Sequence, residues 1–474
     1  MTAKQTPKLD VRNLLESGFN EETARSLYAQ GEEVVIFALM QLAALALKTN
    51  DINGTHPSAS VPTFQKEPGK KRKKKPGAKP GHKGSRRPPP VITQRLEHRA
   101  TKCPDCGTKL NKRNQVRKRL TEDIPHNITP EVTEHTIHRD YCPNCRKIVE
   151  PVVPDAMPNA TIGHRTVVLT AFLHYYVGTT ISQIVEIFNT QFYFKLTPGG
   201  LVHLWHNLAS VLTFWYEKIG EAARNSAVLH ADETGWRVNG KTHWLWCFSN
   251  KDVTYYVIDR SRASPVVKRF FKRVFNGVLV TDFWGAYNAV VCAAKQKCLA
   301  HLLGDLKKVE KYKDKGGDWP TFSKRLKRLL RDAMRLRGRR DSIPPSEYEG
   351  LRNRIEKRLT QHLKAAWKNT EAKRLVKRLK RHRQELLTFL YDDGVPFDNN
   401  HAERVIRNGV VMRKNSYCNR SVDGAETQAV LMSIFATLKQ RGFHGTSTIV
   451  EAVRKFLVTK NLPELPRKTL HTAE

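Results

Sequence analysis

The sequence predicts a multidomain α/β protein, and three observations support that prediction. The chain has 474 residues, 39% of them hydrophobic, which is enough for several domains of ~100 to 200 residues and at least one sizeable core. Stretches of alternating apolar residues are interleaved with stretches of helical spacing, as in a mixed α/β domain. A Lys-rich run and two Cys-x-x-Cys pairs precede that domain and indicate separate units.

The composition is strongly basic, with a formal net charge of +37 and a pI near 10.0. Such a charge concentrates polyanions around a protein, and Lys and Arg contacts to phosphates supply most non-specific nucleic-acid affinity. Double-stranded DNA is therefore the expected partner. Ribosome-like or membrane-surface adhesion stays open, because basicity alone does not choose among polyanions.

No targeting or membrane segment is expected. The N-terminus lacks the pattern of a signal peptide, and the longest apolar stretch, residues 34–47, is too short to span a bilayer and contains Gln41. We therefore expect a cytoplasmic protein.

The first 95 residues are predicted to contain a helical region and a linker. Residues 1–60 form the N-terminal helical region, with a helix over 10–48 that would either dimerise as a coiled coil or pack on its own chain. Residues 61–95 form a basic flexible linker, because Pro and Gly punctuate like charges. Its run of consecutive basic residues is expected to contact the DNA backbone: Lys70, Lys71, Arg72, Lys73, Lys74 and Lys75.

Residues 96–155 are predicted to form a zinc ribbon. The four thiols of two Cys-Pro-x-Cys turns would close a tetrahedral structural site: Cys103, Cys106, Cys142 and Cys145. A hairpin is expected between the pairs, because apolar and polar residues alternate around residues 132–138. The alternative is four unligated cysteines.

Helices and strands should alternate in the remaining chain. Residues 156–225 are predicted to be helical, with a candidate helix-turn-helix over 180–206 whose second helix covers 198–208; plain helical packing is the alternative. Residues 226–303 should contain four strands and a helix, with Gly240 in the first turn. Residues 304–395 form a basic helical insertion, since residues 324–383 hold 22 Lys plus Arg against 6 Asp plus Glu. Residues 396–440 return to the core, and residues 441–474 form a tail.

Three carboxylates are predicted to form a metal site. Asp232 and Asp282 end two apolar strands, and Glu403 falls in an early turn of a helix that starts near Asn399 or Asn400. Strand alternation puts Glu233 on the face opposite Asp232. Oxygen ligands suit Mg²⁺ or Mn²⁺, and metal-assisted phosphoryl transfer needs acids facing one cleft. Alone, each acid has a simpler explanation, such as an i+4 pair or a strand-end turn.

These segments resemble the bacterial transposases of the insertion-sequence sixty-six family. The resemblance rests on HADETGW, VTDFWGAY and NNHAERVIRNGVVMRKNSY, supported by PGHKG and the cysteine pairs, and spans residues 66 to 440. It implies an RNase H-like core interrupted by an insertion, with Asp232, Asp282 and Glu403 as an Asp-Asp-Glu triad. Cys298 and His301 resemble a Cys-x-x-His motif of related transposases; two ligands do not make a site, so a structural or DNA-orienting role is expected.

The sequence thus predicts a DNA transposase, a polynucleotidyl transferase that uses catalytic Mg²⁺ and structural Zn²⁺. Basic residues near the Glu are expected to hold the DNA backbone: Arg404, Arg407, Arg413 and Lys414. A homodimer or higher oligomer is expected from the synapsis of two DNA ends, with accessory transposition proteins as further partners. An RNase H-like nuclease that cuts without joining and a non-catalytic zinc-containing regulator are the alternatives.

Overall fold

The computed structural model describes residues 25, 28–29, 35, 91–98, 100–110, 118–121, 124, 128–158, 160–312 and 316–467. The chain divides into two compact units, residues 1–122 and residues 123–474. The predicted N-terminal helix lies outside the described residues except for four positions, and the basic run at 70–75 lies wholly outside them.

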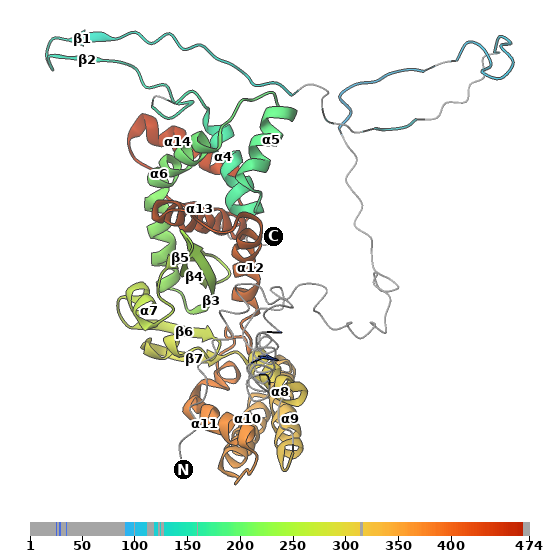
Figure 1. Cartoon of the computed structure of the whole chain (residues 1–474), viewed down its shortest axis with the longest axis vertical. Helices are drawn as coiled ribbons and strands as arrows, with labels where there is room; N and C mark the ends of the chain where they lie inside the picture. The colour runs from blue at the N-terminus through green and yellow to red at the C-terminus, as the bar shows by residue number, and fades with distance from the viewer. Residues whose placement is uncertain are drawn as a thin grey trace. The chain divides into compact units, whose positions relative to one another are not determined.

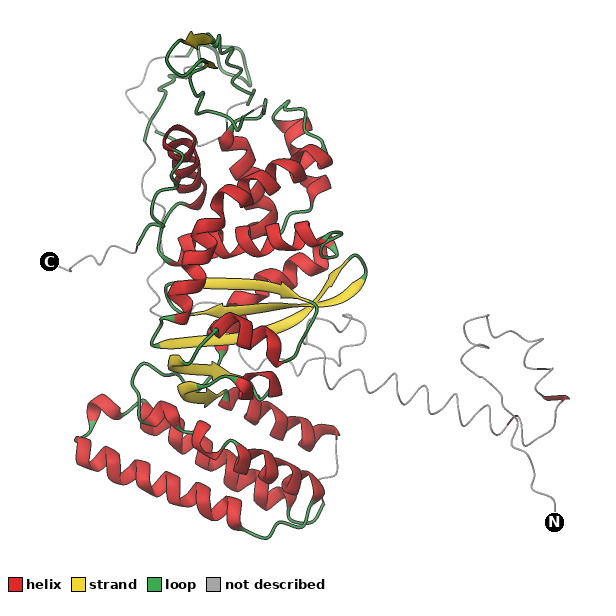
Figure 2. Cartoon of the chain, turned by 90° about the vertical axis from the view of Figure 1, so that its left-hand side faces the viewer, coloured by secondary structure: helices red, strands yellow, loops and turns green. Residues whose placement is uncertain are grey.

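The second unit is built on a five-stranded mixed sheet with the order β5-β4-β3-β6-β7 (Figure 2). Strands β3 (Val228–Val238), β4 (Lys241–Ser249) and β5 (Thr254–Asp259) are antiparallel, whereas β6 (Phe275–Thr281) and β7 (Cys292–Lys297) run parallel to β3. The four predicted strands are confirmed, as is the turn at Gly240, which has a φ of 72° that suits glycine. Helix α7 (Ser264–Phe271) ends earlier than expected, because Phe275 already belongs to β6.

A group of five helices lies next to β5, the strand at the antiparallel edge of the sheet. They are α4 (His164–Phe172), α5 (Ile181–Gln191), α6 (Pro198–Arg224), α13 (Val422–Gln440) and α14 (Gly445–Thr459), with a π-helical turn at Leu173–Val177 (Figure 1). Helix α6 begins at the predicted residue but continues beyond residue 208, and its buried face, including Trp205 and Trp215, belongs to the main core. The predicted tail instead contains α14, whose Ile449 and Val453 are buried.

Both edges of the sheet are closed by side chains from distant segments. On β5, the backbone N–H groups of Thr254 and Tyr256 donate to Thr437 Oγ1 at 3.1 Å and Ser433 Oγ at 2.9 Å, both from α13. On β7, the backbone carbonyl of Lys295 accepts from Thr388 Oγ1 at 2.6 Å. Unpaired strand edges are sites of unwanted pairing, so these contacts protect the sheet.

Strand β7 was not predicted. Its sequence, CAAKQK, has neither β-branched nor aromatic residues, yet Gln296 and Lys297 are fully buried. Their polar groups are satisfied by specific partners, so tertiary contacts override a weak strand propensity.

The predicted basic insertion between β7 and the last core helices is helical. It contains α8 (Leu299–Tyr312), α9 (Trp319–Arg337), α10 (Pro345–Lys364) and α11 (Thr370–Arg381), with short 3-10 turns at Arg340–Ser342, Arg383–Glu385 and Thr388–Leu390. These helices form a second core that also includes Val278 and Val280 of β6. Figure 2 shows them on the side of the sheet opposite the other helices. Helix α10 starts at the predicted pair of prolines, which suits proline's fixed φ.

A small hairpin lies around the second cysteine pair, formed by β1 (Asp140–Cys142) and β2 (Lys147–Val149). The hairpin predicted between the cysteine pairs is wrong, because residues 131–139 have no strand pairing. The apolar and polar residues that alternate over 132–138 therefore belong to no strand, and the apolar ones are not buried: Val132, for example, is exposed. No helix within the described residues is both long and apolar enough to cross a membrane.

Candidate functional site

The parallel pairing of β3 and β6 brings Asp232 and Asp282 to the same end of the sheet. His230 lies opposite Val280, and each acid lies two residues farther along its strand. The pKa of the Asp232 carboxyl is raised well above its usual range by burial, and further by the negative charges of Glu233, Asp282 and Glu403. Asp282 and Glu403 therefore each lie within electrostatic reach of Asp232.

The loop that carries Asp282 is fixed from two sides. Asp282 Oδ1 accepts the backbone N–H of Trp284 at 2.8 Å. Its carbonyl oxygen accepts from Lys297 Nζ at 3.0 Å, and the same ammonium donates to Thr281 Oγ1 at 3.0 Å. Burial lowers the pKa of Lys297, which nearby Glu385 partly offsets. Sequence reasoning missed Lys297, because it ends the strand that was not predicted.

Helix α12 (Asn400–Ser416) carries Glu403 in its first turn, as predicted. The preceding residue, Asn399, is fully buried and does not cap the helix with its side chain. Instead its Nδ2 donates to the carbonyl of Ala231 at 2.9 Å, and its Oδ1 accepts from Nδ1 of His230 at 3.0 Å. Asn399 thus ties the start of α12 to the strand residues directly before Asp232. From the sequence, the paired asparagines in NNHAE predicted only where the helix starts and not these contacts with β3.

Glu233, the neighbour of Asp232, is held by partners of its own, although the negative charge of Asp282 adds to burial in raising the pKa of its carboxyl. It is buried, and Tyr287 donates to its Oε2 at 2.5 Å. Arg262 pairs with its other oxygen, and the guanidinium lies between the rings of Trp244 and Trp284, 4.4 Å and 3.8 Å from their centroids. This network connects the far face of β3 to the Asp282 loop, since Trp284 Nε1 also donates to the carbonyl of Arg262 at 3.0 Å. Arg262 gave no recognisable sequence signal.

Cys298 and His301 lie beside Glu403. His301 Nδ1 is 3.5 Å from Glu403 Oε1, and one ligand atom from each of the three residues lies within 4.8 Å of the others. Cys298 precedes α8, and its sulfur accepts the backbone N–H of Asn399 at 3.2 Å. Burial raises the pKa of this thiol to about 11.

The basic residues of α12 divide into two groups. Arg404, Arg407 and Lys414 are exposed. Arg413 is half-buried, and its guanidinium donates to Thr234 Oγ1 at 3.2 Å and to the carbonyl of Gly235. Part of its hydrogen-bonding capacity is therefore used to hold α12 against β3.

Each cysteine pair lies in a tight turn. In the first unit, Cys103 donates from its backbone N–H to Thr108 at 2.9 Å, and a hydrogen bond with Thr108 lowers the pKa of Cys106. In the second unit, the backbone N–H of Cys145 donates to Cys142 Sγ at 3.4 Å and lowers the pKa of that thiol. Lowered pKa values favour the thiolate form that zinc binds. Closure of one four-sulfur site by both pairs stays a prediction.

The protein is thus a mixed α/β protein in which two of the predicted acids come from neighbouring parallel strands, Asp232 from within β3 and Asp282 from directly after β6. The family model described as "Transposase IS66 family" matches residues 160–427, more than half of the chain, so the chain belongs to that family. This confirms the resemblance drawn from the sequence motifs. A comparison with curated proteins found no match.

Proposed function

We propose that this protein is a DNA transposase that cuts the ends of its insertion sequence and joins them to target DNA at one site formed by Asp232, Asp282 and Glu403. The observation that carries this proposal is the raised pKa of Asp232, caused by burial and by the neighbouring acids. Neighbouring carboxylates repel one another, and a cation held between them would offset that repulsion. Family membership supplies DNA as the substrate.

The strand arrangement supports an RNase H-like core. Three antiparallel strands continue into two parallel ones, and the helical insertion separates β7 from α12. Asp232, Asp282 and Glu403 offer carboxylate oxygens, the donor set that Mg²⁺ and Mn²⁺ prefer. When bound, such a cation would polarise the scissile phosphate and lower the pKa of the attacking water.

The chain's own residues would position this chemistry. Asn399 and Lys297 hold Glu403 and Asp282 in place through the hydrogen bonds described above. Hydrolysis at the element end breaks the bond from phosphorus to the 3′ oxygen and leaves a 3′ hydroxyl. That hydroxyl then attacks a phosphodiester of the target, and a target oxygen leaves. Exposed Arg404 and Arg407 would hold the DNA backbone beside Glu403.

The decisive experiment compares cleavage and joining of labelled element-end DNA in Mg²⁺ by the wild type and by Asp232→Asn, Asp282→Asn and Glu403→Gln. These changes remove charge but keep size. Asp423→Asn, which neutralises an exposed acid at the start of α13, is the matched control. We expect the three variants to bind DNA, yet neither cut nor join, while the control does both.

Other outcomes select the alternatives. Cutting without joining by the wild type would make the protein a nuclease. Unchanged cutting and joining in all three variants would refute this triad. A wild-type protein that binds the DNA but neither cuts nor joins it would favour a zinc-containing regulator, which needs no carboxylate chemistry.

A further inference from the structure

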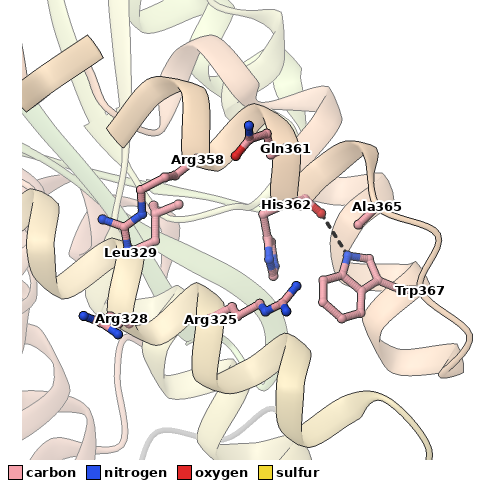
Figure 3. Close-up of a pocket in the computed structure, with 8 residues that line it drawn as sticks. All are labelled: Arg325, Arg328, Leu329, Arg358, Gln361, His362, Ala365 and Trp367. Atoms are coloured by element: carbon pink, nitrogen blue, oxygen red, sulfur yellow. Dashed lines mark hydrogen bonds between the residues drawn. The ribbon is translucent and has the colours of Figure 1, made fainter. Parts of the chain in front are cut away.

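The helical insertion, which separates Asp282 from Glu403 in the sequence, contains a basic hollow between α9 and α10 (Figure 3). Its volume is about 430 Å³. Three guanidinium groups line it together with a histidine, an amide and an indole: Arg325, Arg328, Arg358, His362, Gln361 and Trp367. None of its lining residues is acidic, so the hollow favours an anion.

His362 is the residue that distinguishes this hollow from an ordinary basic surface. Its side chain is 7% exposed, and its Nε2 has no hydrogen-bond partner among the described residues. The ring hangs from α10 toward Arg325, beside Trp367, whose Nε1 donates to the His362 carbonyl at 2.8 Å (Figure 3). A buried polar atom without a partner is costly, and a ligand oxygen could satisfy it once the side chains that cover this nitrogen move aside.

His362 is suited to act as an uncharged hydrogen-bond donor. Burial and the nearby charge of Arg325 lower the pKa of the ring to about 4. At neutral pH the ring is therefore uncharged and can carry its hydrogen on Nε2. It would donate one hydrogen bond, while the arginines supply the positive charge.

The arginines are available to different extents. Arg358 donates to Asp332 Oδ2 at 2.9 Å, so at least one N–H group of its guanidinium already has a partner. Arg325 and Arg328 are exposed, and within the described part of the chain neither makes an ion pair. Arg328 also lines a second hollow of about 590 Å³ beside α9, with Lys324, Lys327, Arg331 and Arg335 and with one acidic residue, Glu310, which pairs with Lys327. The two hollows thus adjoin along one helix and form a basic track.

We propose that this track binds the sugar-phosphate backbone of a DNA strand, with one phosphate seated in the α9–α10 hollow against Arg325, Arg328 and His362. Arginine forks match phosphate oxygens, and adjoining sites along one helix suit a repeating polyanion better than a single small anion. The proposal rests on DNA being the substrate of the proposed transposase, but it assigns DNA contact to the insertion, where no sequence motif indicated it.

The test measures equilibrium binding of a labelled DNA duplex to the full-length protein over a range of salt concentrations, without divalent metal. Arg325→Gln/Arg328→Gln should weaken binding about tenfold and reduce the slope of log affinity against log salt by about one to two, because each lost phosphate contact accounts for ~0.9. The control, Lys373→Gln/Lys377→Gln, removes the same charge from the exposed face of α11. It should leave the slope within a few tenths of wild type.

His362→Phe separates a binding role from a packing role. It keeps a ring against Phe322 and Trp367 but removes the unpartnered nitrogen. We expect this variant to melt at a higher temperature than wild type and to bind DNA more weakly, by about threefold to tenfold. Unchanged DNA affinity with a lower melting temperature would make His362 a packing residue and refute the proposal.

Two further outcomes are decisive. Inorganic phosphate can be added alone and followed by thermal shift. If the arginine pair is needed for phosphate binding but not for DNA binding, the hollow is a small-anion site and the proposal is overturned. Because the readout needs no catalysis, loss of DNA binding in these variants supports the track even if the triad proposal fails. Conversely, if the triad variants are inactive but Arg325→Gln/Arg328→Gln binds DNA as the wild type does, only this inference is refuted.

Discussion

Arg262 donates two hydrogen bonds to a single carboxylate oxygen of Glu233, from Nε at 3.1 Å and from Nη2 at 2.9 Å. Burial raises the pKa of Glu233, and Arg262 together with Tyr287 counteracts that rise. Removing one partner of a buried pair leaves an uncompensated charge. We expect Arg262→Leu to lower the free energy of unfolding by about 3 kcal/mol, measured by denaturant unfolding.

The matched control is Arg441→Leu. Arg441 binds Asp252 with the same two kinds of N–H, at 3.1 and 2.7 Å, but that carboxylate is 47% exposed. Arg441→Leu should lower the free energy of unfolding by less than Arg262→Leu does, because water solvates the remaining charge of Asp252. Adding Glu233→Gln to Arg262→Leu should restore part of the stability. An equal loss of unfolding free energy in both arginine variants would contradict the role given to the burial of Glu233.

Asn399→Leu should reduce DNA cleavage about 100-fold while leaving DNA affinity unchanged. The substitution removes the hydrogen bonds to β3, so Glu403 shifts relative to Asp232, and a shift of about 1 Å can cost that much activity. Asn415→Leu is the control, since Asn415 lies in the last turn of the same helix and also donates to a carbonyl, that of Gly178, at 3.1 Å. A comparable loss of cleavage in both variants would indicate a general effect on α12.

Gly409→Ala should destabilise the protein although it adds a better helix former. An added Cβ would lie 2.2 Å from Leu245 Cδ2, and Leu245 is fully buried in β4. Overpacking costs ~1 to 3 kcal/mol, more than the ~1 kcal/mol gained in helix propensity. Gly304→Ala, in α8, meets nothing within 4 Å and should raise the melting temperature. Thermal unfolding of both variants tests the contrast.

Asp232→Asn should stabilise the protein when divalent cations are absent. The native pKa of Asp232 is raised, so the unfolded chain ionises first as pH rises above ~4. Native stability therefore falls from that pH up to the raised native pKa, and the neutral amide escapes this loss. We expect a gain of about 1 to 2 kcal/mol at neutral pH that shrinks toward pH 4. A gain that does not change with pH would refute this electrostatic origin.

Zinc content offers a separate prediction. Purified protein should hold one zinc ion per chain, and Cys103→Ser or Cys142→Ser should each abolish it, because a tetrahedral site needs all four thiolates. Cys292→Ser, which changes a half-buried cysteine outside both turns, should keep the metal. Elemental analysis after dialysis checks this. Zinc retained by either single variant would show that the two pairs do not share one ion.

Much of the core could be predicted from the sequence, because β3, β4 and β6 are apolar and alternate or form short runs. The two strand acids were found for the same reason: each follows such a run. Strand β7 could not be found, since its burial depends on partners almost a hundred residues away, such as Phe389. The hairpin around residue 135 failed because alternation without a buried face does not determine a strand.

The residues that hold the acids were the harder part of the site. Asn399, Lys297 and Arg262 act through contacts across the fold, with partners separated from them by 168, 15 and 29 residues. A local sequence pattern cannot predict contacts between residues so far apart in the chain. His362 was overlooked because its spacing on α10 matches that of buried leucines.

The protected edges of the sheet also determine when the fold can be completed during synthesis. Ser433, which closes β5 at Tyr256, follows it by 177 residues, and Thr388, which closes β7 at Lys295, follows it by 93. All five strands therefore leave the ribosome well before either edge can be closed, and a chain truncated before α13 would keep the β5 edge open. Nascent and truncated chains are thus the species most exposed to aggregation and most dependent on chaperones.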